Sequence, residues 1–132
     1  MSRIARLMVM LSGVACMAVG QDVVFKHPWL YDSHGDAHTV QLVFRPVEHD
    51  IVVREKTSVL FQIPYDAVTE FSYDRSSKGL LTKRHWFTIH YKSPEGWSEE
   101  VVLEMFSGER DRIIEAANAQ TGKGVKLPSR GK

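Results

Sequence analysis

Hydrophobic and polar residues alternate with a period of two over most of the region from Thr39 to Met105. In the clearest segment, which begins at His85, the apolar residues on one face are Phe87, Ile89 and Tyr91. Alternation of this kind is typical of a strand with one buried face. It predicts six strands, at residues 40–45, 51–54, 59–63, 68–74, 85–91 and 101–105.

The period changes to that of a helix after residue 105. Ile113 and Ala117 fall on one stripe, Ser107 is the expected N-cap, and Gly122 suits the position after the last turn. A single terminal helix must bury its stripe on the preceding strands. The pattern therefore predicts a mainly β protein with one C-terminal α-helix. Its strands form a strongly bent antiparallel sheet or a barrel of six to seven strands capped by the helix.

The remaining stretches are less regular. Residues 21–38 form an irregular N-terminal segment, in which Pro28 argues against a central strand. A seventh strand would come from residues 23–31 or 79–82. Residues 75–84 are expected to form a long connection, and residues 124–132 a disordered basic tail.

The first twenty residues have the pattern of a signal peptide. Arg3 and Arg6 precede an apolar run over residues 7–19, and small residues at 18 and 20 suit a cleavage site. An uncleaved anchor is the alternative, but the run is shorter than the about 20 residues that span a bilayer. We expect cleavage after Gly20 and export to the periplasm or the medium.

Cleavage would change the composition in two ways. The mature chain would have 132 − 20 = 112 residues, the size of one domain, and would lose Cys16, the only cysteine, so no disulfide could form. Lys and Arg would fall from 17 to 15 against 16 Asp and Glu, a formal charge of −1. Bulk attraction to nucleic acid or to an anionic membrane is therefore not indicated. A small domain without disulfides behind such a leader suggests a bacterial envelope protein.

The sequence gives no support for catalysis. The mature chain has no Cys, no Gly-x-Ser-x-Gly elbow and no glycine-rich phosphate loop. Glu99 and Glu100 are neighbours on a strand and point to opposite faces, which is poor geometry for shared acid–base work. We expect a protein that is not an enzyme and needs no cofactor.

A metal site is one alternative. Alternate residues of an extended loop project to one side, so four candidate ligands could converge: Asp32, His34, Asp36 and His38. The spacing matches no standard metal motif, and a solvated polar loop is the favoured interpretation. The corresponding function would be that of a small metal-binding protein or metalloenzyme.

A basic connection is the main candidate for ligand binding. Cations flank two leucines in the order Arg75, Lys78, Leu80, Leu81, Lys83 and Arg84. Such a tip could place the leucines among acyl chains and the cations at headgroup phosphates. The favoured alternative is that the leucines pack as a further strand or cover the barrel end. Trp86 could anchor a protein partner, but packing beneath residues 25–31 is preferred. His85 and His90 are expected at the surface or an edge.

Two segments resemble a known family. The run Phe-Gln-Ile-Pro-Tyr-Asp-Ala-Val at residues 61–68 resembles a strand-and-turn segment of bacterial pleckstrin-homology-like and GRAM-like domains, and residues 113–123 resemble their closing helix. The resemblance covers residues 39–123. It implies a seven-stranded bent barrel capped by a C-terminal helix, without shared catalytic residues. It also implies a scaffold that binds lipid headgroups, peptides or proteins.

These observations lead to one functional expectation. The chain would be an exported, non-enzymatic binding module of the bacterial cell envelope, recognising a protein partner or anionic lipid headgroups. A structural accessory subunit is a further alternative to the metal-binding protein.

Overall fold

The computed structural model describes residues 20–78 and 82–128, and within them it is mainly β with one C-terminal α-helix, as predicted. The strands are β1 (Val23–Phe25), β2 (Trp29–Tyr31), β3 (Ala37–Thr39), β4 (Gln41–Arg45), β5 (Asp50–Glu55), β6 (Ser58–Pro64), β7 (Val68–Lys78), β8 (Thr82–Lys92), β9 (Ser98–Met105) and β10 (Val125–Lys126). A short 3₁₀ turn, η2 (Tyr65–Ala67), joins β6 to β7, and helix α2 (Arg110–Thr121) follows β9.

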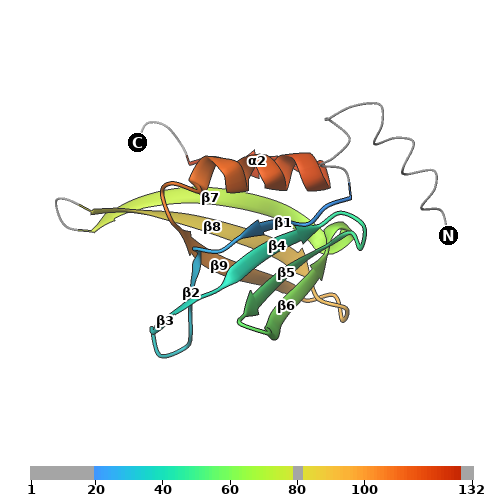
Figure 1. Ribbon diagram of the computed structural model, residues 1–132, viewed down its shortest axis with the longest axis horizontal. Helices are drawn as coiled ribbons and strands as arrows, with labels where there is room; N and C mark the ends of the chain where they lie inside the picture. Colours follow the sequence, from blue (N-terminus) through green and yellow to red (C-terminus); the bar gives the residue numbers. More distant parts are fainter. Residues whose placement is uncertain (1–19, 79–81, 129–132) are drawn as a thin grey trace.

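The strands form two sheets, and the helix lies along one side of them (Figure 1). The first sheet has the order β1-β4-β5-β6, and the second has the order β10-β7-β8-β9-β2-β3. Neighbouring strands are antiparallel except for β10 and β7. The two sheets do not close into a barrel: over the described residues, β6 pairs with β5 alone.

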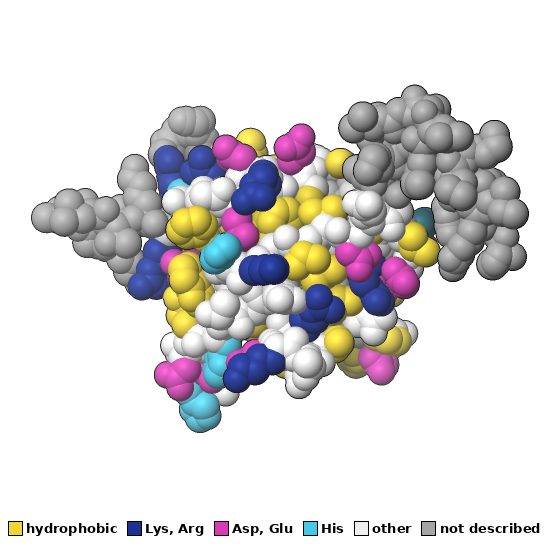
Figure 2. Space-filling model, viewed as in Figure 1, with side chains coloured by type: hydrophobic (Ala, Val, Ile, Leu, Met, Phe, Trp, Pro, Cys, Tyr) yellow, Lys and Arg dark blue, Asp and Glu magenta, His cyan; other side chains and the backbone are white. Residues whose placement is uncertain are grey.

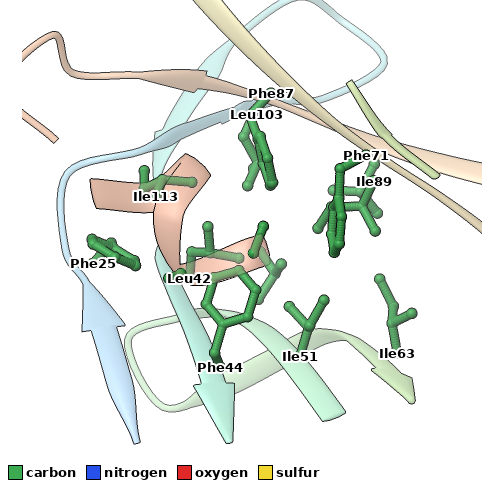
Figure 3. Packing of buried hydrophobic residues seen from close by; sticks show 14 of the residues in the cluster. Phe25, Leu42, Phe44, Ile51, Ile63, Phe71, Phe87, Ile89, Leu103 and Ile113 are labelled. Carbon is green, nitrogen blue, oxygen red and sulfur yellow. The ribbon is translucent and has the colours of Figure 1, made fainter. Parts of the chain in front are cut away.

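The core lies between the sheets and beneath the helix (Figure 3). Phe87 and Ile89 are fully buried, as the alternation of β8 predicted, and the rings of Phe71 and Phe87 stack with centroids 5.5 Å apart. Ile113 and Ala117 close the core from the helix side. Burial of these apolar faces is the main force that holds the two sheets and the helix together.

The N-terminal segment is more regular than expected. β1 pairs antiparallel with β4, Val24 opposite Val43, so this segment supplies a further strand to the first sheet. β2 lies between β9 and β3, although Pro28 immediately precedes it. The proline is tolerated because it stands before the strand, where its missing N–H removes no ladder bond. Its carbonyl accepts a hydrogen bond from the Val40 N–H at 2.9 Å.

The predicted long connection at residues 75–84 is wrong, because β7 and β8 pair as a hairpin over residues 75–78 and 82–84. Pairing continues from Arg75 opposite His85 to Lys78 opposite Thr82. The hairpin projects well beyond the end of α2 in Figure 1. Hydrophobic periodicity cannot detect this stretch because its strand residues are polar. Its strands follow only from the pairing register of the buried residues, which continues into it.

The ends of the helix differ from expectation in two details. The N-cap is Glu109 rather than Ser107, because the Glu109 N–H bonds the Phe106 carbonyl at 2.8 Å and an extra turn precedes the helix. Gly122 takes the left-handed conformation, φ 74°, as predicted. This turns the chain back, and Val125–Lys126, expected to lack regular structure, pairs with β7 as the parallel strand β10.

Candidate functional site

The surface carries two neighbouring hollows where the two sheets fail to meet. The larger, about 390 Å³, is lined by Leu30, Tyr31, Phe61, Trp86, Glu100, Val101 and Val102. The second, about 330 Å³, is lined by Leu30, Asp32, His38, Glu55, Leu60 and Phe61. Leu30 and Phe61 line both, so the two hollows are adjacent. We call this region, between β6 on one side and β2 and β9 on the other, the seam.

Two strand edges border the seam. β6 has no partner beyond β5 within the described residues. β9 pairs with β8 along its length, but β2 covers only Leu103 and Glu104 on its other edge. Over the described part of the chain, the edge of residues 98–102 therefore has no strand beside it. Unpaired strand edges are sites where another chain can add backbone hydrogen bonds.

A local turn explains why β2 leaves β9 so early. The Asp32 carboxylate accepts hydrogen bonds from the backbone N–H groups of His34 and Asp36, at 2.9 and 3.0 Å. Gly35 completes the turn with φ 86°, a conformation that favours glycine. The chain then folds back on itself as β3, which leaves the rest of the β9 edge open.

Apolar side chains stand partly exposed along the seam. Leu60 is 39% exposed and Val102 is 36% exposed, and Val59 beside Leu60 is also exposed. The pairing of β6 with β5 shifts register between Val53 and Arg54, which leaves Leu60 as a bulged residue on the edge strand. Exposed apolar groups beside an unpaired strand edge mark a surface suited to association.

Aromatic and charged groups fix one wall of the seam. The rings of Trp86 and Tyr31 lie 5.8 Å apart, so Trp86 packs on the N-terminal segment as preferred from the sequence. The indole N–H of Trp86 donates to the Ser76 hydroxyl at 2.9 Å, and the Tyr31 hydroxyl donates to Glu104. The bond to Glu104 raises the pKa of Tyr31, with burial adding to the shift. This wall is therefore held by specific contacts as well as by packing.

The lining of the seam, together with that of a third hollow beside it, is acidic. A third hollow of about 290 Å³ adjoins the larger one at Glu100 and is lined by Thr69, Glu70, His90, Tyr91, Ser98, Glu99 and Glu100. None of the described residues that line the three hollows is Lys or Arg. Their carboxylates are Asp32, Glu55, Glu70, Glu99 and Glu100. A ligand in contact with this surface would be favoured by positive charge.

His38 sits between two carboxylates at one end of the seam. Its Nε2 lies 2.9 Å from Asp32 Oδ2, and its Nδ1 lies 3.3 Å from Glu55 Oε2. The Asp32 bond, and then the Glu55 bond, raises the pKa of His38. The same bond to His38, helped by the Asp36 N–H, lowers the pKa of Asp32. Figure 2 shows histidine and acidic side chains gathered at this corner, near the β2–β3 hairpin.

The structure brings together only part of the predicted metal ligands. Asp32 contacts His38 through its side chain, whereas His34 and Asp36 donate to the Asp32 carboxylate through their backbone N–H groups. Within residues 20–78 and 82–128, no group of three or more His, Cys, Asp or Glu is placed to hold a metal ion. Glu55, the second carboxylate on His38, comes from a different strand and could not be found by local spacing.

The predicted basic site is spread along a hairpin. Arg75 is exposed, and Arg84 Nε lies 3.9 Å from Glu104 Oε2; neither arginine lines any of the three hollows. The backbones of Lys78 and Lys83 belong to the β7–β8 ladder, opposite Thr82 and Ser77. Leu80 and Leu81 lie outside the described residues, so both interpretations of these leucines remain predictions.

One prediction about the histidines is wrong, because His85 is buried. It shares the inward face of β8 with Phe87, and its Nδ1 lies 2.8 Å from the Tyr73 hydroxyl. The two rings also stack, with centroids 6.0 Å apart. His90, on the opposite face, stays half-buried and lies 3.5 Å from Glu100.

Comparisons with known proteins add no relationship to this picture. No protein-family model matches the chain, and no curated protein matches it. Of the helices in the described part of the chain, none is long and apolar enough to cross a membrane.

Proposed function

We propose that this chain is an exported, non-enzymatic binding module of a bacterial cell envelope, whose seam binds a segment of a protein partner. The resemblance of residues 61–68 and 113–123 to pleckstrin-homology-like domains supports a binding scaffold. A mainly β fold of two sheets with one C-terminal helix is compatible with that architecture, although the sheets here are not closed.

The seam is the observation that carries the proposal. It combines adjacent hollows, partly exposed apolar side chains and two strand edges that lack partners in the described residues. Each feature alone is ordinary on a protein surface, but together they supply both apolar contact area and backbone hydrogen-bonding groups. Those are the two components that recognition of an extended polypeptide uses.

The charge of the seam favours a protein over anionic lipid. Lipid headgroup phosphates would meet the carboxylates Glu100, Asp32 and Glu55 in the seam. They would also meet Glu99 in the hollow beside it. Like charges at such an interface oppose binding. The basic hairpin with Arg75 and Arg84 is the remaining candidate for lipid, and it is tested separately below.

A crosslinking experiment in the producing cells tests the proposal. The photoreactive residue p-benzoylphenylalanine would replace Val102 or Leu60, both partly exposed in the seam. The matched control replaces Val47, an apolar residue of the β4–β5 turn that is 69% exposed and does not line the seam. We expect a discrete protein adduct from positions 102 and 60, and none of that mass from position 47.

Two results would contradict the proposal. One is the same adducts from all three positions, and the other is the absence of any adduct from the seam under conditions where the protein is abundant. Flotation with phosphatidylglycerol vesicles covers the lipid alternative. Binding that is lost in Arg75→Glu with Arg84→Glu, and kept in Val102→Asp, would assign function to the basic hairpin instead.

A further inference from the structure

We propose that the partner segment binds as an added strand on the free edge of β9 at residues 98–102, and that it alternates apolar with basic residues. This inference rests on the proposed function and names the chemistry of its partner. It commits to one occupant, an extended cationic segment of another protein.

The position of the added strand follows from the way β2 ends. β2 pairs antiparallel with β9, with Trp29 opposite Glu104 and Leu30 opposite Leu103, and then turns away. Beyond β2, the same edge of β9 continues along residues 98–102. Within the described part of the chain, no strand pairs with this edge there. Since backbone groups of a strand point alternately to either side, about every second residue there offers its N–H and C=O to a partner.

The shape of the seam explains why alternate side chains of the partner should be apolar. Phe61 of β6 lies across the same hollow as Val101 of β9, and Leu30 is part of the same lining. Leu30 and Phe61 are both half-buried and pack against the core. A strand in this position turns every second side chain toward those groups, and apolar side chains there would extend the core outward.

The charges at the seam explain why the other side chains should be basic. Val101 is buried, so by alternation Glu100 and Val102 face outward on β9, as their exposure shows. Glu100 also joins the larger hollow to the one that contains Glu70 and Glu99. Lys or Arg on the outward face of an added strand would lie beside Glu100, and the Debye length of about 8 Å keeps such neighbours coupled in physiological salt.

The same charges weigh against other occupants. A second copy of this chain that paired through the same β9 edge would place its own Glu99 and Glu100 beside those of the first. Like charges directly opposite on paired strands are destabilising. Anionic lipid would meet the same repulsion.

Synthetic peptides test the inference on the purified protein. The probe is an alternating Lys-Val peptide of nine residues; a Glu-Val peptide of the same length tests the charge requirement. Two further peptides keep the Lys-Val sequence but are N-methylated at every second residue, one at the odd positions and one at the even positions. N-methylation removes the N–H groups that would form hydrogen bonds between strands. We expect the Lys-Val peptide alone to bind at low salt and to slow amide exchange within residues 98–102.

Protein variants separate local from bulk charge. Glu99→Lys with Glu100→Lys should weaken binding of the Lys-Val peptide by roughly tenfold or more, because attraction becomes repulsion at the contact. The matched control is Glu48→Lys with Glu115→Lys, which makes the same change of net charge at exposed positions that line none of the three hollows. The control should bind within about twofold of the wild type. Circular dichroism of both variants verifies that they are folded.

Each other outcome overturns the inference. Equal binding of the Glu-Val peptide removes the charge argument, and equal binding of the N-methylated peptides, or unchanged exchange at residues 98–102, removes strand addition. Protection of these residues by phosphatidylglycerol vesicles would assign the edge to lipid. If a peptide of other chemistry, selected from an unbiased library, protects the seam, this inference fails while the proposed function stands. If no peptide protects the seam, both fail.

Discussion

The rings of Phe71 and Phe87 stack almost in parallel at the centre of the protein, with an interplanar angle of 18°. They come from the neighbouring strands β7 and β8, and both are fully buried (Figure 3). Both residues belong to the long hairpin, so their stacking links its two strands within the core.

Removal of one ring should be strongly destabilising. Phe87→Ala should lower the free energy of unfolding by about 3–5 kcal/mol, because it removes buried apolar area and leaves a cavity beside Phe71. Urea denaturation followed by circular dichroism measures the loss. Trp97→Ala, at a residue that is 68% exposed in the β8–β9 turn, is the control and should change stability by less than about 1 kcal/mol. A loss of that small size for Phe87→Ala would place the ring at the surface.

The ion pair of Arg45 and Asp50 should make stability depend on acid pH. Arg45 Nε and a terminal guanidinium N–H donate to the two Asp50 oxygens at 2.7 and 2.9 Å. These bonds lower the pKa of Asp50 below its ordinary 3.8; burial opposes the shift, and the Gln62 amide adds to it. Because the folded pKa is depressed, the contribution is present above about pH 4 and is lost as pH falls through the folded value.

Asp50→Asn isolates this contribution. At pH 7 the variant should be less stable by about 1–3 kcal/mol, since a hydrogen bond between charged groups is lost and Arg45 keeps its charge. The difference from the wild type should shrink below pH 4. Asp66→Asn, at an exposed carboxylate, is the matched control. Its stability should equal that of the wild type both at pH 7 and below pH 4. A difference that stays constant with pH would show that the ionised pair is not its source.

His38 should titrate above its ordinary pKa of 6.5. Its partners, first Asp32 and then Glu55, favour the charged imidazolium. The folded pKa is raised, so the stabilising contribution is full below pH 6.5 and is lost as pH rises through the folded value. An NMR titration of the His38 ring should show the raised pKa, and Asp32→Asn should lower it. Asp36→Asn, two residues before His38 on the same hairpin, should leave it unchanged.

Tyr65 should tolerate loss of its hydroxyl. Burial raises the pKa of Tyr65 to about 12, with the Asp50 charge as a second cause. Its buried hydroxyl has no hydrogen-bond partner among the described residues. Tyr65→Phe should therefore be neutral or stabilising at pH 7, because it removes an unsatisfied polar group. Since the folded pKa is raised, the wild type should lose stability between pH 10 and 12, and the variant should lose less. Destabilisation at pH 7 would reveal a partner for the hydroxyl.

Export remains a prediction from the leader. The mature chain should begin at Gln21, or at the pyroglutamate that forms when Gln21 cyclises, with residues 1–20 removed. Intact-mass spectrometry of protein from the culture medium or the periplasmic fraction measures this directly. A mass that retains residues 1–20, or a lipid on Cys16, would contradict cleavage at this site.

The sequence alone determined the strands that bury one face and the helix that ends the domain. Phe87, Ile89 and Leu103 are buried because alternation of apolar and polar residues specifies a face without reference to distant parts of the chain. Gly122 ends the helix for an equally local reason, since its left-handed conformation favours glycine. The faces of the main strands and the C-terminal end of the helix could therefore be predicted.

Tertiary structure decided the features that depend on pairing between distant segments. The polar ends of β7 and β8 are strands only because the register of their buried residues continues through them. β10 exists because the turn after α2 brings residues 125–126 to the edge of β7, and Glu55 reaches His38 from another strand. The seam is of the same kind. Leu30 and Val102 are more than 70 residues apart in sequence, and Phe61 lies between them. They line one hollow only because the edges of the two sheets do not meet.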